Sequence, residues 1–207
     1  MVNVIQHINW QFNADGSEGS DAIDKFRNSS DGHSYEHLYS KILPTASRIL
    51  EIGIFKGAFA HFCKTQISSE IFMVGAEMHT YDTPETAMFD DLYTGDAYSE
   101  DFLNWIKENN YHKSFDFVID DGPHTVQSQV WSIRNCAEMM TDNGVYLCED
   151  IQTPENAVTI ARNSPFPENT YLWDNRQMHG RYDDICVVVD RKNIFDKSLK
   201  LLVPSAD

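Results

Sequence analysis

The sequence predicts a doubly wound α/β fold, in which a mostly parallel sheet ends in an antiparallel C-terminal hairpin strand. Short apolar runs that stop at a glycine or an acid alternate with segments of helical periodicity. This alternation is typical of βα units that build a parallel sheet. Near its end the chain carries two apolar runs in succession, joined by residues 177–182, a connection short enough for a hairpin.

The predicted strands are apolar runs that are too short for helices, and the last of them is rich in β-branched residues. They cover residues 47–54, 70–77, 114–120, 145–150, 170–176 and 183–191. Between the second and third of these, residues 81–97 are rich in loop-forming residues, with room for a short helix or strand.

The predicted helices show apolar residues at helical spacing and recognisable first turns. Ser99 precedes Glu100 and Asp101, two acids that favour the positive end of a helix, and Pro154 suits the first turn of another. The helices are predicted over residues 34–43, 56–67, 99–110, 125–140 and 154–163.

Length and composition predict one main domain. The chain has 207 residues, of which 42% are hydrophobic, enough for one sizeable core. Residues 1–32 are polar and are predicted to form an N-terminal arm or cap, with at most a short helix near residues 21–26, and residues 33–207 are predicted to form the domain. No sequence repeat or low-complexity linker divides the chain.

The charge and the cysteines limit the partners and the compartment. A formal net charge of −16 repels phosphate backbones and anionic lipids, which disfavours nucleic acid and membrane partners. The four cysteines form no C-x-x-C motif and are expected to be reduced and buried. With no signal-peptide pattern and no apolar run long enough to cross a bilayer, a soluble cytoplasmic location is expected.

Glycines and acids stand where the first predicted strands end, and in such sheets ligands bind at the carboxyl ends of strands. Glu51, Gly53 and Gly57 form an E-x-G-x-x-x-G pattern that differs from the dinucleotide fingerprint and therefore disfavours a pyrophosphate cradle. Glu77 ends the next strand, where an acid accepts hydrogen bonds from ribose hydroxyls. Asp96 follows in "TGDA" and is placed to take the amino group of an adenine, so the set predicts a nucleoside site.

The stretch "VIDDGPH" ends the strand predicted over residues 114–120. Asp120 and Asp121 are followed by a Gly-Pro turn that returns His124 toward the two carboxylates. Glu149 and Asp150 end the next strand in a similar way. Taken alone, such a corner is either structural or half of a metal site.

These segments together resemble a known family. "ILEIGIFKGAF", "VGAE", "GDA", "FDFVIDDGPH" and "GVYLCED" resemble class I S-adenosylmethionine-dependent methyltransferases. More narrowly they resemble the metal-dependent sugar O-methyltransferases of the macrocin and mycinamicin type, which share a domain with cephalosporin-hydroxylase-like proteins. The similarity runs over about residues 33–189, and Pro123 and Cys148 are small departures from the family pattern.

The resemblance implies a cofactor and a set of metal ligands. The cofactor is S-adenosylmethionine, and the preceding segment "DGHSYEHLY" implies a cofactor contact from Tyr35. The metal is Mg²⁺ (or Mn²⁺), held by Asp121, Glu149 and Asp150, while Asp120 faces the cofactor. Three carboxylates without a thiolate suit Mg²⁺ better than Zn²⁺.

The resemblance also implies a reaction. His124 would act as general base on a hydroxyl that attacks the sulfonium methyl group. The implied acceptor is a sugar or glycan, with a deoxyhexose such as rhamnose preferred, either on a glycan or on a glycosylated metabolite. The chain would act as a stand-alone enzyme, as a homodimer, or as a domain of a larger glycan-building protein.

Four other interpretations remain open from the sequence. A catechol-type O-methyltransferase also presents vicinal oxygens to Mg²⁺. A nicotinamide-dependent sugar oxidoreductase or epimerase is disfavoured by the missing G-x-G-x-x-G and Tyr-x-x-x-Lys patterns. A module that only binds S-adenosylmethionine would not need the acids and His124. A non-haem iron oxygenase would need a second histidine.

Overall fold

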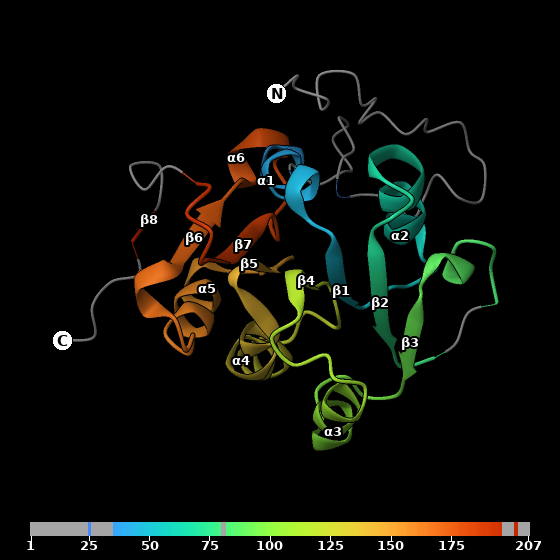
Figure 1. Ribbon diagram of the computed structural model, residues 1–207. Coiled ribbons are helices and arrows are strands. Elements are labelled where there is room, and N and C mark those ends of the chain that lie inside the picture. Colours follow the sequence, from blue (N-terminus) through green and yellow to red (C-terminus); the bar gives the residue numbers. More distant parts are fainter. Residues whose placement is uncertain (1–24, 26–34, 80–81, 196–200, 203–207) are drawn as a thin grey trace.

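Five parallel strands form the first part of a single eight-stranded sheet (Figure 1). The computed structural model describes residues 25, 35–79, 82–195 and 201–202. The strands are β1 (Arg48–Ile52), β2 (Phe72–Glu77), β3 (Asp91–Thr94), β4 (Phe115–Asp120), β5 (Met140–Cys148), β6 (Thr170–Asp174), β7 (Ile185–Asp190) and β8 (Leu201–Leu202).

The order of the strands confirms the predicted doubly wound sheet. It is β3-β2-β1-β4-β5-β7-β6-β8, with β1 to β5 parallel. Strand β7 runs antiparallel between β5 and β6, and β8 pairs antiparallel with β6. The strand order reverses between β1 and β4, and at such a switch point the loops leave in opposite directions and open a crevice.

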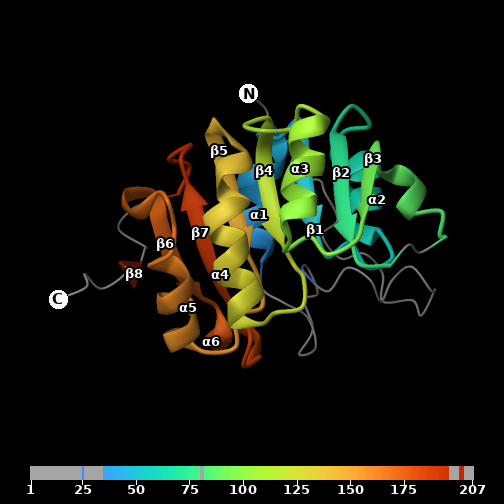
Figure 2. The same ribbon diagram turned by 90° about the horizontal axis from the view of Figure 1, so that it is seen from below.

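Helices cover both faces of the sheet (Figures 1 and 2). Helices α1 and α2 lie on one face, and α3, α4 and α5 lie on the other. The bounds are α1 (Glu36–Ile42), α2 (Ala58–Phe62), α3 (Glu100–Glu108), α4 (Val126–Asn135), α5 (Pro154–Ala161) and α6 (Arg176–His179).

The capping residues define where three helices begin. The Ser99 side chain accepts a hydrogen bond from the Phe102 amide and caps α3, as predicted. Thr125 caps α4 and Thr153 caps α5 in the same way, with Pro154 at the first position of α5. Each cap places the start of its helix beside the carboxyl end of the preceding strand.

Two segments differ from the sequence prediction, and a third, left open between helix and strand, forms a strand. Helix α4 ends at Asn135 rather than at residue 140, because a 3-10 turn over Ala137–Met139 leads into β5, which starts five residues earlier than expected. The connection predicted as a loop over residues 177–182 contains part of α6. Within the loop-rich segment 81–97, residues Asp91–Thr94 pair with β2 and form β3.

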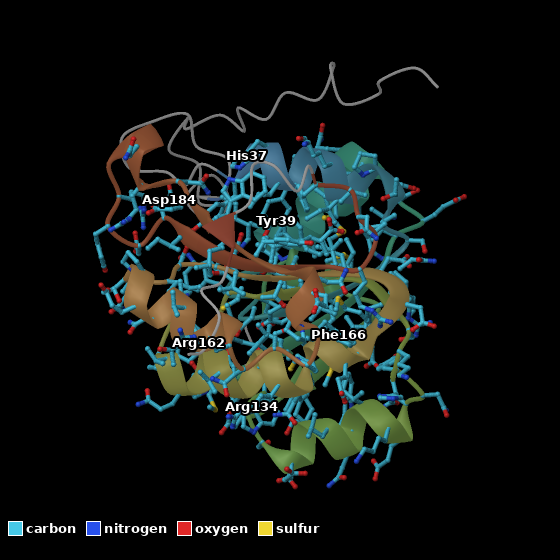
Figure 3. All side chains as sticks on the ribbon, turned by 90° about the vertical axis from the view of Figure 1, so that its left-hand side faces the viewer. His37, Tyr39, Arg134, Arg162, Phe166 and Asp184 are labelled. Carbon is cyan, nitrogen blue, oxygen red and sulfur yellow. The ribbon has the colours of Figure 1, made fainter. Side chains whose placement is uncertain are left out.

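The core consists of two apolar clusters, one on each face of the sheet, and strand alternation assigns neighbouring residues to different clusters. Leu50 and Val118 pack toward α3, α4 and α5, whereas Ile49 and Phe117 pack toward α1 and α2. Figure 3 shows the same division edge-on, with Tyr39 on the α1 side and with Arg134 and Arg162 on the other.

All four cysteines are buried and free, as expected for reduced thiols. Among the residues that the structure describes, no helix has the length and apolar character needed to cross a bilayer.

Candidate functional site

A cleft of about 650 Å³ opens at the carboxyl ends of β1, β2 and β4, the position expected from the strand order. Six of the residues singled out from the sequence line it: Gly53, Glu77, Asp96, Asp121, His124 and Asp150. They come from five different strand-to-helix or strand-end connections, and the sheet brings them to one edge.

The loop after β1 requires glycine at two positions. Gly53 has φ +83°, and a Cβ atom there would lie 2.0 Å from the carbonyl oxygen of Asp121. Gly57 also has φ +83°, and its Cβ would lie within 2.9 Å of backbone atoms of Glu85. The E-x-G-x-x-x-G pattern therefore lets the β1 loop pass close to the β4 corner and to the segment before β3.

Glu77 and Asp96 are held in the cleft by backbone amides. The Glu77 carboxylate accepts hydrogen bonds from the amides of Phe55 (3.0 Å) and Met78 (2.8 Å). Asp96 accepts from the amide of Tyr98 at 2.9 Å. Each carboxylate oxygen has a second lone pair, so both side chains remain able to accept from a ligand's hydroxyl or amino group.

His124 faces two carboxylates across the cleft floor. Its Nε2 atom lies 3.9 Å from Asp121 Oδ1 and 3.8 Å from Asp150 Oδ2. One ligand atom from each of these three residues lies within 4.8 Å of the others, a spacing that fits a single metal ion. Two carboxylates and one imidazole are suitable donors for a divalent ion such as Mn²⁺ or Mg²⁺.

The backbone at this cluster is strained. His124 has φ +54° and Asp150 has φ +55°, and Phe55, which lines the same cleft, has φ +47°. The left-handed region costs a residue with a side chain about 1–2 kcal/mol. Strain held at three positions around one cleft is typical of a functional site, because these side chains could not reach their positions from an extended strand end.

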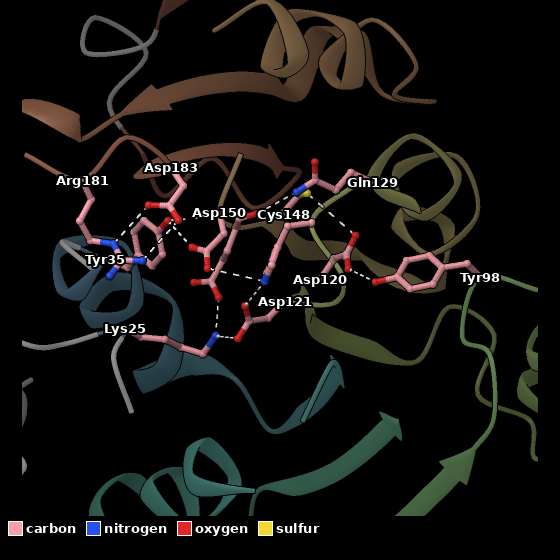
Figure 4. A network of polar contacts seen from close by, with 12 residues as sticks. Lys25, Tyr35, Tyr98, Asp120, Asp121, Gln129, Cys148, Asp150, Arg181 and Asp183 are labelled. Carbon is pink, nitrogen blue, oxygen red and sulfur yellow. Dashed lines mark hydrogen bonds and ion pairs between the residues drawn. The ribbon is translucent and has the colours of Figure 1, made fainter. Parts of the chain in front are cut away.

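Glu149 is adjacent to this group, but its carboxylate points into the protein. Its side chain is 1% exposed, and its Oε1 atom accepts a hydrogen bond from the Tyr39 hydroxyl at 2.7 Å. Its Oε2 atom pairs with the ammonium of Lys25, which also pairs with Asp121 (Figure 4). Burial, opposed by Lys25, raises the pKa of Glu149 to about 8.

Strand β5 ends at Cys148, so Glu149 and Asp150 lie beyond the regular strand, in which neighbouring side chains would point to opposite faces. Gln129 of α4 donates from its side chain to the Glu149 carbonyl at 3.0 Å. The two acids are thus fixed by α4 and by tyrosines of the α1 segment, although their carboxylates take different directions.

Four other residues singled out from the sequence lie behind the cleft wall. Asp120 is 1% exposed and accepts from the Tyr98 hydroxyl at 2.6 Å. Tyr35 is fully buried and donates to Asp150 Oδ1 at 2.8 Å. Glu51 is 2% exposed, and its Oε2 atom has no hydrogen-bond partner among the described residues. Gly57 shapes the β1 loop without lining the cleft.

Sequence reasoning missed Lys25, Tyr39 and Tyr98. Tyr39 lies one helical turn after Tyr35, and that i, i+4 spacing was available as a signal that both point to the same face. Lys25 lies in a polar stretch, and no local pattern indicates that it reaches the ends of β4 and β5. The rest of the predicted arm, residues 1–24 and 26–32, lies outside the described residues.

Tyrosine hydroxyls are the recurring partners of the carboxylates. Besides the pairs of Tyr35, Tyr39 and Tyr98, the Tyr111 hydroxyl donates to Asp91 at 2.7 Å. Burial is the largest cause that raises the pKa of each of these tyrosines above the ordinary value, for Tyr111 to about 12. These neutral donors satisfy the acids without cancelling their charge.

We expect alkaline unfolding to be coupled to tyrosine ionisation. A pKa raised in the folded state stabilises the protein fully below the unfolded value of roughly pH 10, and this stabilisation is lost as the pH rises through the folded value. Ultraviolet absorbance of tyrosinate should therefore rise together with loss of the circular dichroism signal above about pH 10. Tyr39→Phe should reduce the amplitude of that joint step. Complete ionisation before any unfolding would contradict the expectation.

No protein-family model matches the chain, and no curated protein matches it. Among solved structures, the MycE methyltransferase of the mycinamycin biosynthetic pathway, in complex with Mg, SAH and mycinamycin VI, is similar at 17% identity and a TM-score of 0.53. The match covers 75% of this chain and 48% of that one.

Two further solved structures are similar to this chain. Another crystal form of MycE with Mg and SAH has 22% identity and a TM-score of 0.50, over 61% of this chain and 34% of that one. The O-methyltransferase from Bacillus cereus in complex with SAH has 18% identity and a TM-score of 0.51, over 75% and 79% of the two chains. The chain thus spans between a third and a half of the MycE length. These similarities confirm the predicted fold, the Rossmann-like fold of class I methyltransferases.

Proposed function

We propose that this chain is an S-adenosylmethionine- and divalent-metal-dependent O-methyltransferase that methylates a sugar hydroxyl. The observation that carries the proposal is the presence, in one cleft, of two different groups. Glu77 and Asp96 offer carboxylate oxygens to a nucleoside, and Asp121 and Asp150 offer carboxylate oxygens to a cation in the same cleft, with His124 beside them. A methyl donor and a metal-oriented acceptor need these two groups side by side.

The cofactor part is supported by the β1 loop and by the two fold relatives crystallised with SAH. Gly53 lets the backbone of the β1 loop approach a ligand closely, and Gly57 shapes that loop from outside the cleft lining. Glu77 would accept from the ribose hydroxyls, and Asp96 would accept from the adenine amino group.

The metal part is supported by the chemistry of the donors. Asp121 and Asp150 offer hard oxygen atoms that lie within 4.8 Å of each other. When bound, a divalent ion would orient two vicinal hydroxyl groups and ease the loss of a proton from one of them. Glu149, the third carboxylate implied by the family resemblance, remains part of the proposed ligand set.

His124 is proposed as the general base. Its Nε2 atom faces the cleft between two carboxylates, which stabilise the imidazolium that forms when it takes the hydroxyl proton. When bound, S-adenosylmethionine would supply a methyl group on a sulfonium, which the deprotonated oxygen would take as the bond from that carbon to sulfur breaks.

The acceptor class rests on the sequence resemblance and on MycE, whose structure was determined with mycinamycin VI. A rhamnose-containing glycan or glycosylated metabolite is the preferred acceptor, because adjacent hydroxyls on one ring offer two oxygens to the same ion. The proposal allows three forms of the enzyme: a chain that acts alone, a homodimer, or a domain of a larger glycan-building protein.

The test combines binding and transfer. Isothermal titration of S-adenosylmethionine and SAH, with and without Mg²⁺, is made on the wild type, on Asp121→Asn and on Asp142→Asn. Asp142 is the matched control, because its side chain is 83% exposed and pairs with Arg191 away from the cleft. All three proteins should bind SAH, and transfer to a rhamnoside should require Mg²⁺ and fail only in Asp121→Asn.

The outcomes separate the alternatives. No binding of either nucleoside by the wild type would reject the methyltransferase proposal. Transfer to a catechol but not to any glycoside would correct the acceptor class. Equal transfer by Asp121→Asn and the wild type would reject the metal cluster.

A further inference from the structure

Lys25 brings a positive charge into the acidic end of β4 and β5. Its side chain is 5% exposed, and its Nζ atom forms ion pairs with Asp121 Oδ2 and Glu149 Oε2. The same atom lies 5.8 Å from the centre of the Phe59 ring, a cation–π distance. The ammonium is therefore held by two carboxylates that follow neighbouring strands, with the Phe59 ring of α2 beside it.

The Lys25 ammonium lies between the ends of β4 and β5 and pairs with a carboxylate from each. Asp121 follows β4 and Glu149 follows β5, and the structure bridges their carboxylates through Lys25. A metal ion bound by both of these carboxylates would have to occupy the space that the Lys25 ammonium now fills. The other Glu149 oxygen accepts from the Tyr39 hydroxyl, so both oxygens of this carboxylate already have a partner inside the protein.

We propose that the ammonium of Lys25 and a divalent ion exclude each other between Asp121 and Glu149. This inference rests on the proposed function, because it assumes that an ion binds at this cluster. Two cations that share carboxylates within a few ångströms repel strongly in a partly buried site. Binding through Asp121, Glu149 and Asp150 together therefore requires that the Lys25 ammonium leave its position.

With Lys25 in place, a smaller set of donors remains. Asp121 Oδ1 and Asp150 Oδ2 remain available, at 3.9 and 3.8 Å from His124 Nε2, and Glu149 is held back by Lys25 and Tyr39. Lys25 thus sets which ligands the ion can use and how tightly it binds. An ammonium that occupies the position in more than about nine tenths of the molecules lowers the apparent affinity for the ion about tenfold.

The experiment is a titration with Mn²⁺, followed by electron paramagnetic resonance of the free ion. Lys25→Met removes the charge but keeps a long apolar side chain, and it should bind Mn²⁺ at least about tenfold more tightly than the wild type. Lys25→Arg keeps the positive charge and should bind Mn²⁺ no more tightly than the wild type. Lys107→Met is the matched control, because it makes the same change in net charge at an exposed residue near the end of α3 and should leave the affinity unchanged.

A second measurement uses the wild-type protein and does not depend on the folding of a variant. Acetylation of Lys25 by an amine-reactive ester is followed by mass spectrometry with and without saturating Mg²⁺. The buried ammonium should react slowly without the ion and several-fold faster with it. Exposed Lys107 serves as the internal standard and should react equally in both conditions.

Unchanged or weaker Mn²⁺ binding by Lys25→Met would overturn the inference, and so would acetylation of Lys25 that Mg²⁺ does not accelerate. Absence of Mn²⁺ binding in every variant would overturn it as well. SAH titration of the same samples separates this failure from failure of the proposed function. If SAH binds and Lys25→Met binds Mn²⁺ no more tightly than the wild type, only the mutual exclusion of Lys25 and the ion is wrong. If Lys25→Met gains Mn²⁺ affinity but SAH does not bind, the methyltransferase proposal is rejected and the mutual exclusion stands.

Discussion

Gly53→Ala is expected to destabilise the protein by at least about 3 kcal/mol and to abolish SAH binding. The added Cβ would lie 2.0 Å from the Asp121 carbonyl oxygen and 2.5 Å from its carbonyl carbon. Both are backbone atoms, so no side chain can turn away to make room. The β1 loop and the β4 corner would have to separate, and they form one wall of the cleft. Urea unfolding and isothermal titration with SAH measure the two effects.

Gly180→Ala is the matched control. Gly180 also has a left-handed backbone, with φ +77°, but among the described residues no atom lies within 4 Å of the position that its Cβ would take. It should therefore show the conformational cost alone, about 1–2 kcal/mol, and leave SAH binding intact. Similar losses of stability at the two positions would mean that the contact with the β4 corner is not what requires glycine at position 53.

The second large effect is expected at His124. Replacing it with alanine should lower the rate of methyl transfer by about 10²–10⁴-fold, because the group that takes the hydroxyl proton is removed. The affinity for SAH should change little, since the acids proposed to hold the nucleoside, Glu77 and Asp96, are at the ends of β2 and β3 rather than of β4. Single-turnover transfer to the acceptor identified by screening, together with SAH titration, measures both quantities.

His124→Asn separates the chemistry from the backbone. The position has φ +54°, and asparagine tolerates that region better than alanine does. If His124 is the base, both variants should lose activity equally, although His124→Asn should be the more stable. Recovery of most of the activity in His124→Asn would contradict a proton-transfer role and would indicate that the residue shapes the corner.

The fold could be predicted from the sequence because its strands are apolar and buried on both faces. Runs such as residues 114–120 and 183–191 carry that pattern clearly, and β4 and β7 lie there. Strand β3 could not be predicted firmly, because it is a short edge strand whose residues are only partly buried. The early start of β5 at Met140 was hidden by the "DNG" sequence, which reads locally as a turn.

The sequence predicts which acidic residues reach the site, but it does not predict the direction in which each carboxylate points. The sequence places acids at strand ends, and the parallel sheet then brings Glu77, Asp121 and Asp150 to one cleft. Which way each carboxylate turns depends on partners far away in sequence, such as Tyr39 for Glu149 and Tyr98 for Asp120. Such choices follow from tertiary packing, for which local periodicity carries no information.

The insertion of β7 between β5 and β6 has a consequence for the order of folding. During synthesis β6 emerges before β7, so β5 keeps an unpaired edge until residues 185–190 leave the ribosome. Strand β7 then pairs with both neighbours at once, and the Ile151 amide donates to the Ile185 carbonyl just beyond the acids that follow β5. The acidic end of β5 is therefore completed late, by pairings between distant parts of the chain, which close slowly. A nascent chain that stops short of β7 exposes the edge most prone to pair with another molecule.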